Sequence, residues 1–130
     1  MSNESKGKAP DIIDAGEFSV AENEAAKAEE QSIYTYVHHF RNPFEYEGKT
    51  YETLTFNWGK LTGDDSLSIE EEMQAAGKPV IVPTFSGGYL MRMAARASSP
   101  RVGFDVLRAL PISEYNQIRS KARSFLLLSE

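Results

Sequence analysis

The side chains with the greatest potential for chemistry are two adjacent histidines and two groups of carboxylates. His38 and His39 are neighbours, while aspartates occupy positions 64–65 and glutamates occupy positions 70–72. Successive residues of a strand point to opposite faces, so one metal ion would not readily bind both imidazoles. The carboxylates are typical of a loop turn and of the first turn of a helix, where the dipole favours negative charge. We therefore predict no metal site and no catalytic residues.

Other kinds of catalysis and cofactor binding lack their sequence motifs. The chain has no cysteine, which excludes disulfides, thiol nucleophiles and cysteine-based zinc sites. No G-x-S-x-G, P-loop or G-x-G-x-x-G motif is present. Residues 86–88 read Ser-Gly-Gly but lack the lysine and the preceding strand of a phosphate loop. We expect no cofactor and interpret the protein as a non-enzyme.

The main cationic group in the middle of the chain consists of four arginines: Arg92, Arg96, Arg101 and Arg108. These side chains could form a nucleic-acid face, a solvated face or ion pairs with an acidic segment. The formal charge of −5 lies entirely in residues 1–31, and the rest of the chain is neutral. Because nucleic-acid binding needs a basic surface, we do not expect nucleic acid as the main partner.

The charge distribution divides the chain into an acidic N-terminal arm, residues 1–31, and a body, residues 32–130. Low hydrophobicity with clustered charge predicts disorder in the arm, and a solvated helix over residues 21–31 is the alternative. The body is long enough for one modest core. No apolar run approaches the roughly 20 residues that span a bilayer, and the start of the chain is polar. We expect a soluble, intracellular protein without a membrane partner.

The first half of the body predicts a β-hairpin. Aromatic and β-branched residues over 33–40 indicate a strand, and Asn42-Pro43 indicates an edge strand, a bulge or a break. Gly48 suits a three-residue hairpin loop over residues 47–49. Alternation of Leu54, Phe56 and Trp58 gives the second strand one apolar face. Residues 59–66 are predicted to form a loop.

The remainder predicts helices. Ser68 and Glu71 fit a capping box, and Gly77 is a helix stop, which predicts a helix over residues 69–76. Thr84 is the expected cap of a helix through Ser98. Residues 102–110 form a short helical segment, and Pro111 begins the last helix, 112–128. Strands followed by helices predict the α+β class, with a short antiparallel sheet before a mainly helical part.

Two of these helices carry more apolar residues than one buried stripe requires. Met91 lies off the stripe of the predicted helix that ends at Ser98, and Leu127 and Leu128 lie off the stripe of the last. Methionine adapts to irregular surfaces and is used by promiscuous binders of helices. The alternative is that these residues complete a core or a homo-oligomer interface. The candidate partner-binding residues are Phe85, Tyr89, Leu90, Met91, Met93, Phe125, Leu127 and Leu128.

Two segments carry a resemblance to a known family. Residues 43–54 read PFEYEGKTYETL and resemble a P-x-E-Y-E-G-K-x-Y-x-x-L hairpin signature. Residues 110–118 read LPISEYNQI, followed by Phe125-Leu126, and resemble L-x-x-x-D/E-Y-x-x-I…F-L. In order and spacing, these signatures are similar to those of the phage tail assembly chaperone family. The departures are the acidic arm and Glu114, where aspartate is frequent.

The resemblance implies a function without catalytic residues. Members of the family bind the tape measure protein and keep it soluble until the tail tube polymerises around it. They are generally absent from the finished particle, so the resemblance implies the cytoplasm of a bacterial host as the location. It also implies the tail tube protein as a further partner. A structural tail component that remains in the particle is the alternative function.

Overall fold

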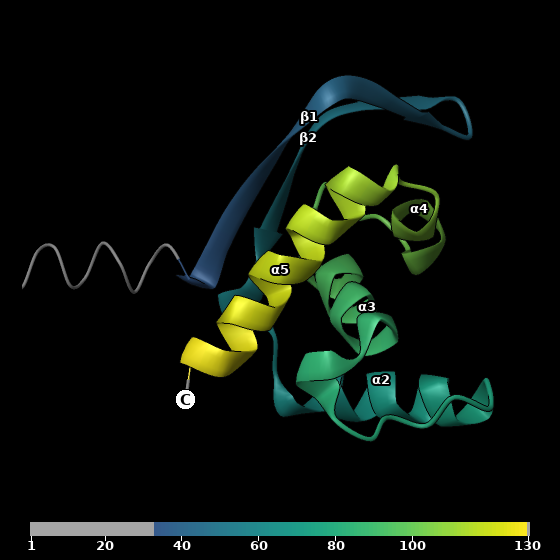
Figure 1. Ribbon diagram of the computed structural model, residues 1–130, viewed down its shortest axis with the longest axis vertical. Helices are drawn as coiled ribbons and strands as arrows, with labels where there is room; N and C mark the ends of the chain where they lie inside the picture. The colour runs from purple at the N-terminus through teal and green to yellow at the C-terminus, as the bar shows by residue number, and fades with distance from the viewer. Residues whose placement is uncertain (1–32, 130) are drawn as a thin grey trace, which may run out of the picture. The chain divides into compact units, whose positions relative to one another are not determined.

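The computed structural model describes residues 33–129, which form a three-stranded antiparallel sheet and a set of helices (Figure 1). The sheet order is β1-β2-β3, and the mainly helical part follows the long hairpin, which confirms the predicted α+β class. The predicted acidic arm lies outside the described residues. The elements in chain order are β1 (Thr35–Tyr46), β2 (Lys49–Asn57), η1 (Trp58–Lys60), α2 (Gly63–Ala75), η2 (Pro83–Phe85), α3 (Gly87–Ala97), β3 (Ser98–Ser99), α4 (Phe104–Arg108) and α5 (Ile112–Leu128).

Strands β1 and β2 form the predicted hairpin, but its turn is shorter than expected. Tyr46 pairs with Lys49, so the loop contains only Glu47 and Gly48. Both residues have positive φ, 49° and 81°. Two such residues match the twist of the flanking strands, which explains why a two-residue turn replaces the predicted three-residue loop.

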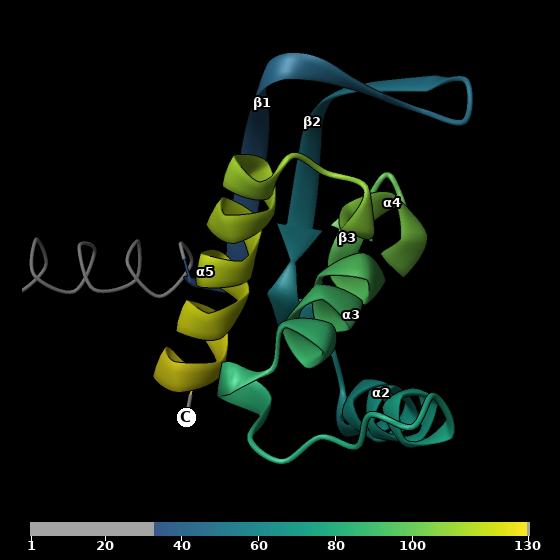
Figure 2. The same ribbon diagram turned by 45° about the vertical axis from the view of Figure 1, so that its right-hand side comes forward.

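The predicted irregularity at Asn42-Pro43 is a shift of strand register. Pairing runs regularly to His39 opposite Thr53 and resumes with Phe44 opposite Tyr51. Pro43 has no N–H and cannot donate a hydrogen bond between the strands. The unpaired residues of β1 therefore lie where one such bond is missing in any case. The hairpin bends, and its tip extends away from α5 (Figures 1 and 2).

The core lies between one face of the sheet and helices α3 and α5. Leu54, Phe56 and Trp58 are buried, which confirms the apolar face predicted from their alternation. Helix α3 contacts β2, helix α5 contacts β1, and the two helices contact each other (Figure 2). Burial of each large apolar side chain contributes about 1.5–3 kcal/mol, so this junction holds the helical part against the hairpin.

Helix α2 begins earlier than predicted. The helix spans Gly63–Ala75, whereas a loop over 59–66 and a cap at Ser68 were expected. Thr62 is the actual N-cap, and its backbone N–H donates to Asp65 Oδ2 at 2.8 Å. The same capping geometry is therefore formed six residues upstream, with aspartate in the place of the usual glutamate or glutamine. Gly77, with φ of 78°, follows the helix end as predicted.

Helix α3 is shorter than predicted at both ends. Its cap is Ser86 and not Thr84, because the Ser86 Oγ accepts a hydrogen bond from the Tyr89 N–H at 3.1 Å. Its C-terminal neighbours Ser98 and Ser99 leave the helix and pair with β2 as strand β3. The free edge of β2 recruits these residues, a contact that local sequence does not reveal.

The last two helices agree with their predictions. Helix α4 lies inside the predicted 102–110 segment, and α5 spans Ile112–Leu128 as predicted. Ile112, the first residue of α5, is 75% exposed, so this apolar side chain does not contribute to the core. Among residues 33–129, no helix has the length and apolar character to cross a bilayer.

Candidate functional site

The candidate partner-binding residues of α3 are buried. Tyr89, Leu90, Met91 and Met93 lie in the core, each no more than 5% exposed. The Tyr89 hydroxyl is also hydrogen-bonded to the Ser66 hydroxyl at 2.6 Å. Other parts of the fold cover these four side chains, so they are not exposed to a partner in this structure. They complete the core, which was the alternative interpretation.

The remaining candidates lie on or near the surface. Phe85, Leu127 and Leu128 are 67%, 48% and 64% exposed. Phe125 is half-buried, and its ring stacks on Trp58 with 6.2 Å between ring centroids. Phe125 therefore anchors α5 to the core, whereas the first three residues are free to contact a partner. Their partner binding remains a prediction.

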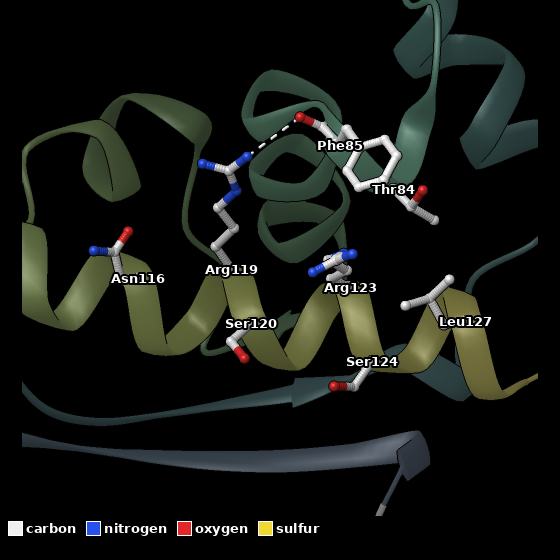
Figure 3. A pocket seen from close by; sticks show the side chains of 8 residues that line it. All are labelled: Thr84, Phe85, Asn116, Arg119, Ser120, Arg123, Ser124 and Leu127. Carbon is white, nitrogen blue, oxygen red and sulfur yellow. Dashed lines mark hydrogen bonds between the residues drawn. The ribbon is translucent and has the colours of Figure 1, made fainter.

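Two of the exposed residues share a groove between η2 and the C-terminal half of α5 (Figure 3). Its volume is about 350 Å³. Figure 3 shows Arg119, Arg123 and Leu127 extending from α5 toward Phe85 of η2. The lining residues are Thr84, Phe85, Asn116, Arg119, Ser120, Arg123, Ser124 and Leu127.

Helical periodicity places the α5 residues of the groove together. Arg119, Arg123 and Leu127 follow one another at four-residue intervals, so they project along one side of the helix. On the opposite wall, Pro83 begins the short η2 turn, whose Phe85 N–H donates to the Val82 carbonyl at 3.0 Å. The chain does not continue directly from this turn into α3, and the Phe85 ring stays at the surface.

The two arginines of the groove are held by neutral groups. Arg119 Nη2 donates to the Phe85 carbonyl oxygen at 3.2 Å, and Arg123 Cζ lies 5.1 Å from the centroid of the Phe85 ring. Within residues 33–129, the ion pairs involve other cations, and no acidic residue lines the groove. The groove thus combines apolar surface with two positive charges that no described carboxylate neutralises.

Sequence reasoning assigned Phe85 and Leu127 to partner binding but missed the polar lining of the groove. The sequence analysis assigned no function to Arg119 and Arg123. The signal was their four-residue spacing from Leu127, the apolar residue that already fell outside the stripe. What the sequence could not show was that η2 packs opposite this side of the helix.

The middle arginines Arg92 and Arg96 have a different environment. Arg96 contacts Asp65 at 2.9 Å and Glu72 at 3.3 Å, and Arg92 contacts Glu72 at 3.5 Å. The Thr62 N–H and then Arg96 lower the pKa of Asp65, and the bond to Asp65 raises the pKa of Arg96. These arginines join α3 to α2. They are ion-paired to a helix of the body, a partner that the sequence had not suggested.

A buried polar chain connects β1 to the first turn of α5. The hydroxyl of Tyr36 is 2.8 Å from His38 Nδ1, and His38 Nε2 is 2.7 Å from Glu114 Oε1. The Arg41 N–H donates to Glu114 Oε2 at 3.1 Å. Burial, and then the charge of Glu114, raise the pKa of Tyr36.

The position of these hydrogen bonds indicates a structural role, namely the connection of β1 to α5. His38 is fully buried and His39 is exposed, as the strand alternation predicted. Sequence reasoning missed Glu114, which lies 76 residues from His38 in the chain. The described residues contain no group of three or more histidine, cysteine or acidic side chains arranged to hold a metal ion.

Comparison with protein-family models, with curated proteins and with solved structures found no match for this chain.

Proposed function

We propose that this protein is a phage or prophage tail assembly chaperone that binds the tape measure protein. The observation that carries the proposal is the groove beside α5, where Phe85 and Leu127 expose apolar surface at one site. An amphipathic helix can place its apolar face in such a groove. A tape measure protein is long and largely helical, so it offers many such faces.

The sequence signatures support the same function. The C-terminal signature of the family resembles residues 110–118 followed by Phe125-Leu126. All of these residues except the first two lie in α5. This helix also supplies most of the groove. The function therefore rests on a resemblance and on an exposed surface that involve the same helix.

The mechanism is stoichiometric shielding in the cytoplasm of the bacterial host. Several copies bind one tape measure chain and cover its apolar stripes until the tail tube protein offers a larger interface. The affinity of each copy must be modest, because tight binding at every site would make release too slow. Several such contacts along one client add avidity, while each single contact still dissociates fast enough for release.

Co-expression with the tape measure protein of the same phage or prophage tests this function. We expect a soluble complex with several copies per client in size-exclusion chromatography with light scattering, while the client alone precipitates. The variant Leu127→Asp should lose the complex. Leu67→Asp is the matched control, because Leu67 is 58% exposed on α2 and does not line the groove.

Two outcomes contradict the proposal. A client that stays insoluble at every ratio of the two proteins argues against shielding. Rings or tubes formed by this protein alone, without a complex, would favour a structural tail component that remains in the particle.

A further inference from the structure

We infer that the preferred partner of the groove is an acidic amphipathic helix of about three turns, whose carboxylates flank its apolar stripe. The biological role of this preference rests on the proposed function. The preference itself follows from the length, the charge and the polar lining of the groove, and it is tested with isolated helices.

The length of the partner follows from the α5 side of the groove. The lining extends from Asn116 to Leu127, which is eleven residue steps along the helix. At about 1.5 Å per residue, this wall is roughly 16 Å long. A partner helix lying along it makes contact over about three turns, which is long enough to hold the apolar anchors at i, i+3, i+4 and i+7 that are typical of helix-in-groove binding.

The charge of the partner follows from the neutral contacts of the two arginines. A carbonyl oxygen and an aromatic ring hold the guanidinium groups of Arg119 and Arg123 in place without neutralising them. Each guanidinium keeps further N–H donors for a carboxylate, which it can bind through two parallel hydrogen bonds. Acidic residues four apart on a partner helix match the spacing of this pair.

The apolar contacts give the partner its register. Leu127 lies one turn beyond Arg123, and the Phe85 ring lies beside Arg123 on the opposite wall. A partner residue between these two side chains must be apolar, and its acidic residues must lie within about one turn of it. The groove therefore requires both features together, since a uniformly acidic helix leaves the apolar surfaces in water.

Three synthetic 18-residue helices, labelled with fluorescein, test the inference with the full-length protein. The first has a leucine stripe flanked by glutamates, the second has the same stripe flanked by lysines, and the third has the glutamates but serines in place of the leucines. We expect the first to bind at least tenfold more tightly than either of the others in fluorescence anisotropy. Its affinity should fall as salt is added, because the contacts are partly exposed charge pairs.

The charge-reversal variant Arg119→Glu/Arg123→Glu should invert the preference between the first two peptides. The matched control is Lys60→Glu/Arg101→Glu, which changes the net charge equally at exposed residues outside the groove. Circular dichroism and thermal unfolding establish that both variants are folded. An unchanged preference in the groove variant, or an inverted one in the control, would overturn the inference.

The peptide experiment separates this inference from the proposed function. Equal binding of the glutamate and lysine peptides overturns the charge preference, whereas the tape measure complex and its sensitivity to Leu127→Asp would still stand. Binding of the leucine-free peptide as tightly as the first would show simple ion exchange and overturn the inference. Absence of binding by all three peptides also overturns it.

Discussion

Helices α3 and α5 each carry two arginines four residues apart together with large apolar side chains, yet the fold uses them differently. On α3, Arg92 and Arg96 contact carboxylates of α2, and the nearby apolar residues are buried. On α5, Arg119 and Arg123 contact neutral groups beside the exposed Leu127. The same residue types at the same spacing therefore join two helices of the body in one case and line an exposed groove in the other.

The physical cause is coverage by neighbouring elements. Helix α3 contacts α2, α4, α5 and β2, so little of its surface is left to a partner. Among the described residues, helix α5 contacts α3 and β1, and the short η2 turn lines the groove beside it. Function can be assigned to a charged or apolar side chain only after its covering neighbours are known.

The largest expected effect on stability is in the buried apolar residues of α3. Met91→Ala should lower the free energy of unfolding by about 2–5 kcal/mol, because it removes a fully buried side chain and leaves a cavity. Leu127→Ala should change it by less than about 1 kcal/mol, since that side chain is half in water. Urea unfolding measures both values, and similar losses in the two variants would remove the distinction between the helices.

The next effect concerns the first turn of α5, which is joined to β1 through Glu114. Glu114→Ala should destabilise the protein by about 2–3 kcal/mol, because the imidazole of His38 and the N–H of Arg41 lose their buried acceptor. Glu71→Ala, at an exposed position of α2, is the control. Equal unfolding midpoints for Glu114→Ala and the unaltered protein would mean that this connection carries no stability.

A smaller effect separates the two arginine pairs. Arg96→Ala should lower the free energy of unfolding by about 1 kcal/mol, since Arg96 is partly buried and is bonded to Asp65 and Glu72. Arg119→Ala should change it by no more than about 0.5 kcal/mol, but should weaken binding of the glutamate peptide. A greater loss of stability in Arg119→Ala than in Arg96→Ala would contradict this distinction between the two arginine pairs.

The smallest effect is the pH dependence of the α2–α3 connection. The folded-state pKa of Asp65 lies below its ordinary value of 3.8, so its contribution is present above that pH and is lost as the pH falls through the folded pKa. Asp65→Asn should therefore cost up to about 1 kcal/mol near neutral pH and progressively less in acid. Thermal unfolding of both proteins between pH 2 and pH 7 provides the measurement, in which roughly constant differences would contradict the expectation.

Local features of the chain were predictable because they depend on neighbouring residues. Gly48 and Asn42-Pro43 located the turn and the register shift, and Pro111 located the start of α5. Errors occurred where two local solutions competed. Thr62 with Asp65, and not Ser68 with Glu71, caps α2, since both pairs have the same spacing and only packing selects between them.

Local residue patterns were enough to predict the hairpin, the order of strands before helices and the α+β class, because backbone sterics and hydrogen bonds act over a few residues. Three further contacts became known from the folded structure alone: β3 pairs with β2, Glu114 is bonded to His38, and η2 packs beside α5. These contacts join residues far apart in the chain, and no local pattern encodes which pairs meet. The candidate groove depends on the packing of η2 beside α5. Phe85 and Leu127 could be suspected from the sequence, but the residues that line the groove with them could not.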